Sequence, residues 1–506
     1  MSSDPYPLSP KKEMLSLFKK TLAALLVSGL VLAFAACKSG DGPKEPTSTP
    51  ADTPVGTPTD TPTQTPDEEE IDYESDLSTE RFDGYDYRIL VRKGNIATQW
   101  FEEPQEDAVD DAIYKRNKAV EDRYGITVSC AEGTGSNTDT SALNGILAGD
   151  DAYDIIFTHS RSAFSYATQG ACYNALDIKS LHLDKPWWSK NIVNDCSIND
   201  RLYVLDGDIS INGLSSAMCL MFNKRLFDEL GYDYPYDMVR DGEWTFDEFA
   251  YLAKKGGKDL NGDGVMTPED DQYGFWTGMW SAPINILYAG GQKVYNKNEE
   301  GELELTLYSN KTVQIFDSFF NLMNNEACFL EITEGSLDNY DGPAPFPAGR
   351  AMFIAGGLGG AKGYRDMDDD FGILPYPKFD EEDEYSTTIN GAAPLACIPL
   401  TVGDPERTGA ITEALAAYGG KYVLPAFYDV SLKTKYARDD DSEEMMDIIK
   451  DSIIFDVGYL CGGQYQSHGR DLSTTTNHDF SSWYSARESA AKTDLKNFNK
   501  DYAGIE

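Results

Sequence analysis

Basic residues are scarce in this chain of 506 residues. Lysine and arginine together number 43, against 85 aspartates and glutamates, so the net charge is -42. A surface this acidic repels the phosphate backbone, which excludes nucleic acid as an expected partner. The acidity also suits any soluble surface without a specific partner, so it does not by itself indicate a function.

Histidine and closely spaced cysteine are also rare. There are four histidines, and none of the eight cysteines forms a C-x-x-C pair, which argues against a zinc knuckle or a dithiol redox site. We expect free, mostly buried thiols, with Cys196–Cys219 and Cys172–Cys196 as the nearest pairs in sequence if one disulfide forms. G-x-S-x-G, H-E-x-x-H and Walker glycine motifs are absent, so the chain is not expected to be an enzyme.

No apolar run reaches the roughly 20 residues that span a bilayer. The run "LAALLVSGLVLAFAAC", which ends at Cys37 and follows several lysines, predicts a secretory signal over residues 1–36. Translation could start at Met1 or at Met14. The end of the run resembles a bacterial lipoprotein lipobox, with Phe34 in place of the usual leucine. That resemblance implies that Cys37 is lipidated.

Residues 37–81 contain almost nothing apolar. Thr-Pro recurs every four residues from Thr49-Pro50 to Thr65-Pro66, and acidic residues follow. Proline fixes the backbone in extended geometry, and a segment without apolar residues cannot offset the entropy of ordering. We therefore predict an extended tether over residues 37–81, which raises the folded part from a membrane.

From about residue 82, strand and helix patterns alternate. "YDYRILV" (85–91), "ITVSC" (126–130) and "DAYDIIFTHS" (151–160) are strand-like, with amphipathic helical patterns between them. Buried-strand patterns recur later as "MCLMFN" (218–223), "QYGFWTG" (272–278), "RAMFIAGG" (350–357) and "FGILPYP" (371–377). This alternation predicts an α/β fold with parallel strands. Thr245 and Glu248 predict a capping box at the start of a helix over 244–256.

The stretch "DLNGDGVMTPED" is similar to a twelve-residue calcium loop. Calcium takes six to eight oxygen ligands, and Gly264 stands where such a loop turns sharply. The expected ligands are Asp259, Asn261, Asp263, the carbonyl of Val265, Thr267 and Asp270. The motif occurs once, so a structural calcium ion is expected rather than a paired sensor. The alternative is an acidic turn that binds nothing.

Several aromatic and polar side chains follow strands. In open α/β sheets, ligands bind beyond the carboxyl ends of the strands. The candidates for ligand binding are Thr158, Ser160, Arg161, Trp100, Trp276 and Trp280. Flat aromatic faces and hydrogen-bonding groups suit sugar rings, although each tryptophan could equally belong to the core or its rim.

An ordered set of stretches resembles the extracellular solute-binding lipoproteins of ABC transporters, family 1 (sugar type). They include "AIYKRNKAVEDRYGITV", "YDIIFTHS", "RLYVLDGDIS", "MFNKRLFDELG", "GEWTFDEF" and "FPAGRAMFIAGG". The resemblance implies a two-lobe, periplasmic-binding-protein-like α/β fold with hinge crossovers. It implies lobe one over 82–212 plus 356–400 and lobe two over 213–355 plus 401–506. Asp208 and Asn212 would lie near the first crossover and join the ligand site, and Gly356-Gly357 would lie near the second.

The resemblance also implies a function. It would be a monomeric receptor, anchored by lipid on the extracellular face of a bacterial membrane, which passes a small ligand such as a carbohydrate to an ABC permease. Two other classes stay open. One is a surface-anchored enzyme acting on polysaccharides, and the other is a surface sensor with the same fold. Binding without turnover would separate the receptor from the enzyme.

Overall fold

The computed structural model describes residues 71–135, 137–332, 344–364, 366–428 and 440–504. The chain divides into two units, Met1–Glu70 and Ile71–Glu506. The predicted signal, Cys37 and the tether up to residue 70 lie outside the described residues. Within the described ranges, no helix is both long enough and apolar enough to span a bilayer.

The predicted tether ends earlier than residue 81. Leu77 is buried, the ring of Tyr73 lies 6.0 Å from that of Trp187, and Glu74 forms an ion pair with Lys421 at 2.6 Å. Extending the tether over residues 71–81 was therefore wrong. The few apolar side chains of this acidic stretch pack against the folded unit. Composition alone does not reveal these contacts.

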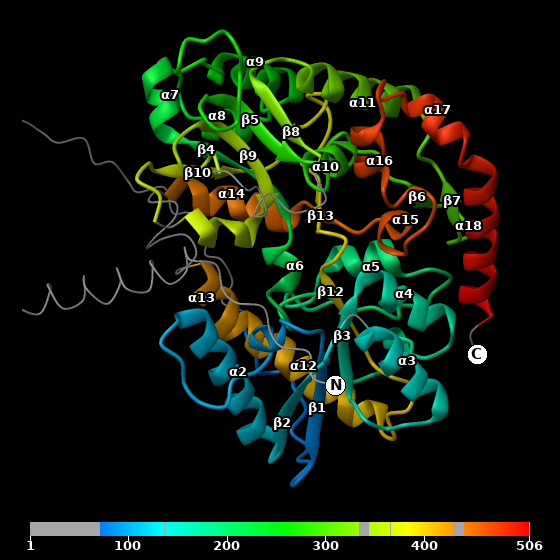
Figure 1. Cartoon of the computed structure of the whole chain (residues 1–506). Helices are drawn as coiled ribbons and strands as arrows, with labels where there is room; N and C mark the ends of the chain where they lie inside the picture. Colours follow the sequence, from blue (N-terminus) through cyan, green and yellow to red (C-terminus); the bar gives the residue numbers. More distant parts are fainter. Residues whose placement is uncertain (1–70, 136, 333–343, 365, 429–439, 505–506) are drawn as a thin grey trace, which may run out of the picture. The chain divides into compact units, whose positions relative to one another are not determined.

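The first sheet has four strands in the order β12-β3-β1-β2 (Figure 1). Their bounds are β1 (Asp86–Val91), β2 (Thr127–Glu132), β3 (Ile155–His159) and β12 (Pro394–Cys397). The first three run parallel, and β12 pairs antiparallel with β3. The strands Asp86–Val91 and Ile155–His159 are mostly buried, as their apolar sequences require.

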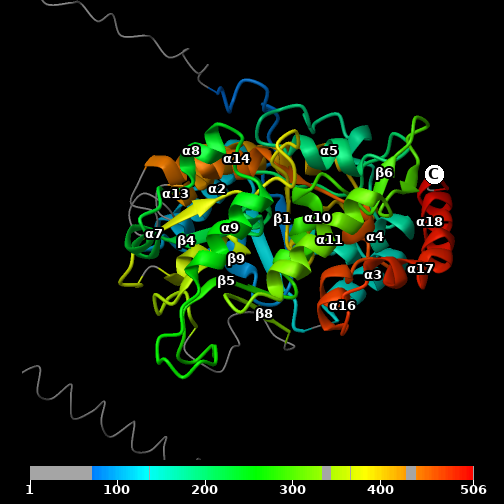
Figure 2. The ribbon, with the colours of Figure 1, turned by 90° about the horizontal axis from the view of Figure 1, so that it is seen from above.

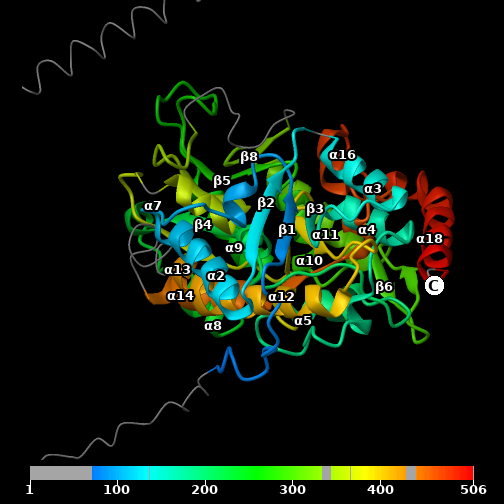
Figure 3. The same ribbon diagram turned by 90° about the horizontal axis from the view of Figure 1, so that it is seen from below.

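Helices flank this sheet on either side of the strands (Figure 3). They are α2 (Ala108–Tyr124), α3 (Thr138–Ala148), α4 (Ser160–Thr168) and α12 (Pro405–Tyr418). Since β2 and β3 lie on opposite sides of β1, right-handed connections place α2 and α3 on opposite faces. Asp107 caps the first turn of α2 by accepting from Val109 N, and Gly125 ends the helix with φ at 71°.

The second sheet has five strands in the order β10-β4-β9-β5-β8. Their bounds are β4 (Met218–Asn223), β5 (Tyr273–Gly278), β8 (Cys328–Glu331), β9 (Ala351–Gly357) and β10 (Phe371–Leu374). All six residues of β4 are buried, which explains its unbroken apolar sequence. The sheet is packed with α7 (Lys224–Leu230), α8 (Tyr236–Arg240), α9 (Phe246–Gly256), α10 (Ala282–Ala289), α11 (Asn310–Met323) and α14 (Asp440–Asp451) (Figure 2).

Shorter elements connect and cover the two sheets. Between them lie α5 (Lys190–Cys196), α6 (Asn212–Ser215), the paired strands β11 (Thr387–Thr388) and β13 (Ile453–Ile454), a π-helical turn (Gly419–Val423) and α13 (Leu424–Tyr428). A hairpin of β6 (Tyr295–Lys297) and β7 (Leu303–Leu305) contacts the C-terminal helix. That end comprises α15 (Val457–Leu460), α16 (His468–Thr474), α17 (Phe480–Ser485) and α18 (Glu488–Ala503). Helix α16 packs on α10, whereas α18 reaches α4, so the C-terminal region contacts both lobes.

We call the first sheet with its helices the first lobe, and the second sheet with its helices the second lobe. Two predicted boundaries disagree with the sheets. Strand β10 pairs with β4, so residues 356–388 belong with the second lobe rather than the first. Helix α12 and the π-helical turn pack on α2, so residues 401–428 belong with the first lobe. The points at which the chain passes from one lobe to the other depend on strand pairing between residues far apart in the sequence, which local sequence patterns do not encode.

Cysteine placement settles two further predictions. All seven cysteines of the described residues are free, and five of them are buried. Neither Cys196–Cys219 nor Cys172–Cys196 is bonded. Cys196 ends α5, whereas Cys219 lies within β4 of the second sheet. The expectation of free, mostly buried thiols is confirmed.

Candidate functional site

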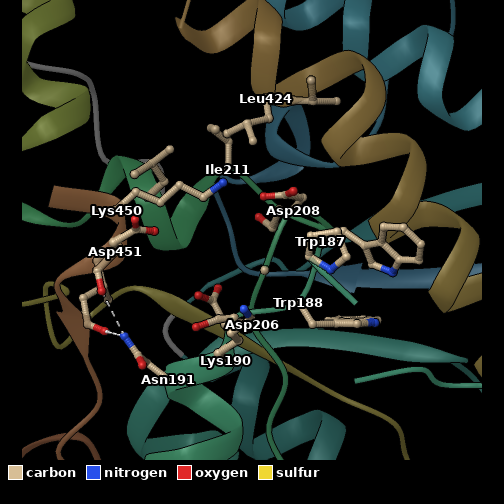
Figure 4. Close-up of a pocket in the computed structure, with 17 residues that line it drawn as sticks. Trp187, Trp188, Lys190, Asn191, Asp206, Asp208, Ile211, Leu424, Lys450 and Asp451 are labelled. Atoms are coloured by element: carbon tan, nitrogen blue, oxygen red, sulfur yellow. Dashed lines mark hydrogen bonds between the residues drawn. The ribbon is translucent and has the colours of Figure 1, made fainter. Parts of the chain in front are cut away.

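A cavity of about 520 Å³ lies between parts of the two lobes (Figure 4). Its walls come from four stretches of chain, residues 186–191, 206–214, 423–424 and 450–453. The first three stretches belong to the first lobe or to the crossover that leaves it. The last is the end of α14 and the start of β13, which pack with the second lobe. A relative movement of the lobes would therefore change the shape of this cavity.

Two antiparallel segments form one wall. Asp208 N donates to Trp187 O at 2.8 Å, and Ser189 N donates to Asp206 O at 3.1 Å. Between them, Gly207 has φ at 153°, and a Cβ there would meet Trp187 O at 2.4 Å. Only glycine allows this close approach. The pairing turns the carboxyl groups on either side of Gly207 into the cavity wall (Figure 4).

These two carboxyl groups, Asp206 and Asp208, have perturbed acidity. Burial raises the pKa of Asp206 to about 7, and the charge of Asp208 adds to that rise. Burial also raises the pKa of Asp208 to about 6, while the charge of Lys450 opposes the rise. Among the described residues, no cation lies within ion-pair distance of Asp206. A buried carboxyl without a counter-charge is open to a ligand that supplies hydrogen-bond donors.

The remaining wall mixes polar and apolar side chains. Asn191 Nδ2 donates to Ile453 O at 2.6 Å and to Asp451 O at 3.3 Å, which joins the two lobes at the cavity edge. Apolar surface comes from Ile211 and Leu424. The indoles of Trp187 and Trp188 are 2% exposed, so they form the base of the wall rather than projecting from it. Together these groups can hold a small, hydroxyl-rich molecule.

Of the eight predicted ligand-binding residues, Asp208 lines this cavity. Asn212 begins the neighbouring helix α6, where its amide lies 3.4 Å from Thr98 Oγ1. Thr158 and Ser160 are fully buried, and Ser160 Oγ donates to Gly391 O at 2.6 Å. Arg161 is exposed and lies against Gly462. The end of β3 therefore meets other protein segments rather than this cavity.

The three predicted tryptophans are far apart in the fold. Trp100 is half-buried in the first lobe, where its Nε1 donates to Val128 O at 2.9 Å. Trp276 is 1% exposed and stacks on Phe329 at 4.3 Å inside the second lobe, so in this structure its ring is closed to ligands. Trp280 is exposed, with the guanidinium of Arg470 at 5.8 Å. The structure does not bring these rings together.

Sequence reasoning missed Trp187, Trp188, Asp206 and Lys450 as wall residues. A usable signal was present in part. "PWW" (186–188) and "LDGDIS" (205–210) combine aromatic, acidic and glycine residues near the first crossover. Their pairing across Gly207 was not visible, because it depends on a contact between segments about 20 residues apart.

The calcium-type loop is held by its own hydrogen bonds. Asp259 accepts from Gly262 N at 2.6 Å and from Gly264 N at 2.8 Å. At the end of the loop, the carboxylate of buried Asp271 points back to the loop and accepts from Thr267 N at 2.7 Å. The predicted ligand Asp270 is exposed. No group of three or more His, Cys, Asp or Glu side chains in the described residues is placed to hold a metal ion. Carboxylate, amide, hydroxyl and carbonyl oxygens are the donors that calcium prefers, so the calcium site stays a prediction.

Comparisons with known proteins come from structure alone. No protein-family model and no curated protein matches the sequence. An ABC substrate-binding protein from Listeria monocytogenes, solved with cycloalternan, is 16% identical with a TM-score of 0.50, over 83% of this chain and 99% of that chain. The GacH receptor of Streptomyces glaucescens, solved unliganded and with acarbose, is 10% identical with a TM-score of 0.51, over 83% and 98%.

A de novo designed esterase is also similar, at 15% identity and a TM-score of 0.55, over 83% of this chain and 99% of that chain. Identities this low establish a fold and not an activity, since one fold carries many functions. The chain has the two-lobe α/β fold of the periplasmic-binding-protein type.

Proposed function

We propose that this protein is a solute-binding receptor that captures a carbohydrate in the cavity between its lobes. The observation that carries the proposal is the cavity itself, whose walls come from both lobes and include the carboxyl groups of Asp206 and Asp208. Its size is in the usual range for a small-molecule site. Two-lobe proteins of this type close around ligands by hinge motion, so affinity and closure would be linked.

A carbohydrate suits the chemistry of the wall. Sugar hydroxyls donate hydrogen bonds to carboxylates, and charged acceptors form stronger bonds than neutral ones. The sugar ring also has apolar C–H faces, which can lie on Ile211 and Leu424. Structurally similar proteins were solved with cycloalternan and with acarbose, both carbohydrates, which supports the ligand class.

The receptor would be held at the extracellular face of the membrane and would pass its ligand to an ABC permease. The support is the sequence alone: a secretory signal, a lipobox-like end at Cys37 and a Thr-Pro-rich tether. A lipid on one cysteine and an extended tether would keep the lobes near a permease while leaving them free to rotate.

Calorimetric titration of residues 71–506 with a panel of mono- and oligosaccharides tests the ligand class. We expect one sugar to bind one site per chain at sub-millimolar concentration, with no product released. Release of a hydrolysis product would instead indicate an enzyme. Binding of peptides or other solutes, with no sugar bound, would contradict the carbohydrate proposal.

We further propose that the loop over residues 259–270 binds calcium as a structural ion, with Asp270 turning inward to join Asp259, Asn261 and Asp263. A ligand that binds only the folded state stabilises it, so removing calcium with EDTA should lower the melting temperature by a few degrees. In the Asp259→Ala variant, EDTA should cause no shift. A wild-type protein whose melting temperature is the same with EDTA and with excess calcium would contradict this proposal.

A further inference from the structure

One acidic residue lies behind the cavity wall rather than in it. Glu413 is in the interior of α12 and is 1% exposed. Burial raises its pKa, and hydrogen bonds to the carboxylate oppose the rise. A carboxylate in such a place is strongly destabilising unless its oxygens are hydrogen-bonded. Its partners therefore indicate why an acid is tolerated at this position.

Both oxygens of Glu413 accept from the wall. Trp187 Nε1 donates to Oε1 at 2.8 Å, and Trp188 Nε1 donates to Oε2 at 2.8 Å. His182 N also donates to Oε2, at 3.0 Å. An indole nitrogen can only donate, so the two tryptophans need an acceptor at each oxygen. Glutamine offers one acceptor and one donor group, and cannot satisfy both.

The same two tryptophans fix the cavity carboxyls. The carbonyl of Trp187 receives the amide of Asp208, and Trp188 forms the antiparallel bridge with Gly207. A shift of either indole would move residues 187–189, and residues 206–208 would move with them. Glu413 is thus connected to Asp206 and Asp208 through two hydrogen-bonded steps, although it does not line the cavity itself.

We propose that Glu413 is a positioning residue of the ligand site: its carboxylate holds the Trp187–Trp188 wall in place and thereby sets the position of the Asp206 and Asp208 carboxyls. The consequence for ligand affinity rests on the proposed function, whereas the placement of the two carboxyls does not. The proposal assigns a role in binding to a residue that touches no ligand.

The same helix offers a matched control. Glu406 lies two turns earlier on α12 and also accepts two backbone amides, Lys179 N at 3.1 Å and Ser180 N at 3.0 Å. Its carboxylate is exposed, forms no hydrogen bond with Trp187 or Trp188 among the described residues, and does not line the cavity. Glu406→Gln therefore removes a carboxylate charge from the same helix without a change at the wall.

The test compares Glu413→Gln, Glu406→Gln, Trp187→Phe and the double variant Trp187→Phe/Glu413→Gln. We expect Glu413→Gln to weaken binding of the sugar found for the wild type by about tenfold or more, and Glu406→Gln by less than about twofold. Phenylalanine at position 187 removes the donor to Oε1, so a glutamine oxygen at the Oε2 position can accept from both Trp188 Nε1 and His182 N, as Oε2 does in the wild type. The double variant should therefore bind within about threefold of Trp187→Phe alone. Equal affinity of Glu413→Gln and wild type would overturn the proposal.

A second readout needs no ligand. The titration of the Asp206 carboxyl, followed by carbon NMR in the ligand-free protein, reports its surroundings. We expect Glu413→Gln to move that titration midpoint and the indole N–H signals of both tryptophans, and Glu406→Gln to move neither. If the wild type binds no sugar, the proposed function fails, but this readout still decides the positioning role. An unmoved Asp206 midpoint in Glu413→Gln, or in Trp187→Phe if Glu413→Gln does not fold, would overturn it.

Discussion

Asp206→Asn is expected to make the ligand-free protein more stable at pH 8 and to remove most of its ligand affinity. The Asp206 side chain is 7% exposed, and burial raises its pKa to about 7 from an ordinary value of 3.8. The unfolded chain releases this proton near pH 4, whereas the folded protein keeps it until about pH 7. Folding therefore takes up a proton in this window, and stability falls as pH rises through it.

At pH 8 the ionised Asp206 destabilises the folded state by an amount on the order of 4 kcal/mol. Asparagine has the same shape and no charge, so we expect Asp206→Asn to recover roughly 1–3 kcal/mol at pH 8. At pH 5 the gain should shrink by about half or more, because the folded wild type is then protonated. Urea unfolding of both proteins at the two pH values measures this difference. An identical gain at both would contradict the assigned burial of a charge.

The loss of affinity follows from the same carboxylate. A hydrogen bond from a ligand hydroxyl to a charged acceptor contributes roughly 1.5–3 kcal/mol, so we expect a tenfold to hundredfold weaker sugar complex. Asp451→Asn is the matched control, since Asp451 lines the same cavity but is exposed at its edge. It should change affinity by less than about threefold. Binding sites commonly retain groups that destabilise the ligand-free protein, because those groups contribute to binding. An Asp206→Asn variant that is both more stable and fully active would contradict this explanation for Asp206.

Arg116→Ala is expected to give the largest loss of stability. Arg116 is 1% exposed in α2; its guanidinium donates to Ile209 O and Gln99 O, both at 2.8 Å, and to Asn117 Oδ1 at 3.0 Å. Burial lowers the pKa of Arg116 to about 10. Alanine leaves three acceptors without this donor and opens a cavity, which together should cost roughly 3–5 kcal/mol of unfolding free energy.

Ile209 directly follows Asp208, so the same substitution frees the crossover beside the cavity. Arg116→Lys keeps the charge but loses the planar fork, and should fall between wild type and Arg116→Ala. The neighbouring Lys115, exposed in an ion pair with Asp111 at 2.7 Å, is the control. Lys115→Ala should change stability by less than about 0.5 kcal/mol. Urea unfolding measures the free energy of unfolding of all three variants. A value for Arg116→Ala within about 1 kcal/mol of wild type would show that the buried guanidinium is not needed for stability.

Much of the fold follows from local sequence patterns. The seven strand-like stretches all form strands, and "MCLMFN" is buried throughout, as an unbroken apolar run requires. The predicted helix after Trp244 forms over Phe246–Gly256. The capping box at its start was wrong, because Thr245 makes no side-chain cap. Its backbone instead pairs with Lys378, whose carbonyl accepts from Phe246 N at 2.7 Å.

The site was far less predictable than the elements. Strand ends do attract ligands in open sheets, but here Ser160 at the end of β3 meets Gly391, and Trp276 packs within its own lobe. The cavity is made where residues near 187, 207, 423 and 450 meet. No local periodicity in the sequence indicates that these four segments come together. The burial that raises the pKa of Asp206 exists only once the cavity has formed.

The central claim is that a carbohydrate occupies the cavity between the lobes. Mass spectrometry of the ligand released from protein purified under native conditions tests it most directly, with Asp206→Asn purified in parallel. The account predicts one carbohydrate per chain in the wild type and little or none in the variant. A released ligand of another class, or a carbohydrate retained equally by Asp206→Asn, would contradict it.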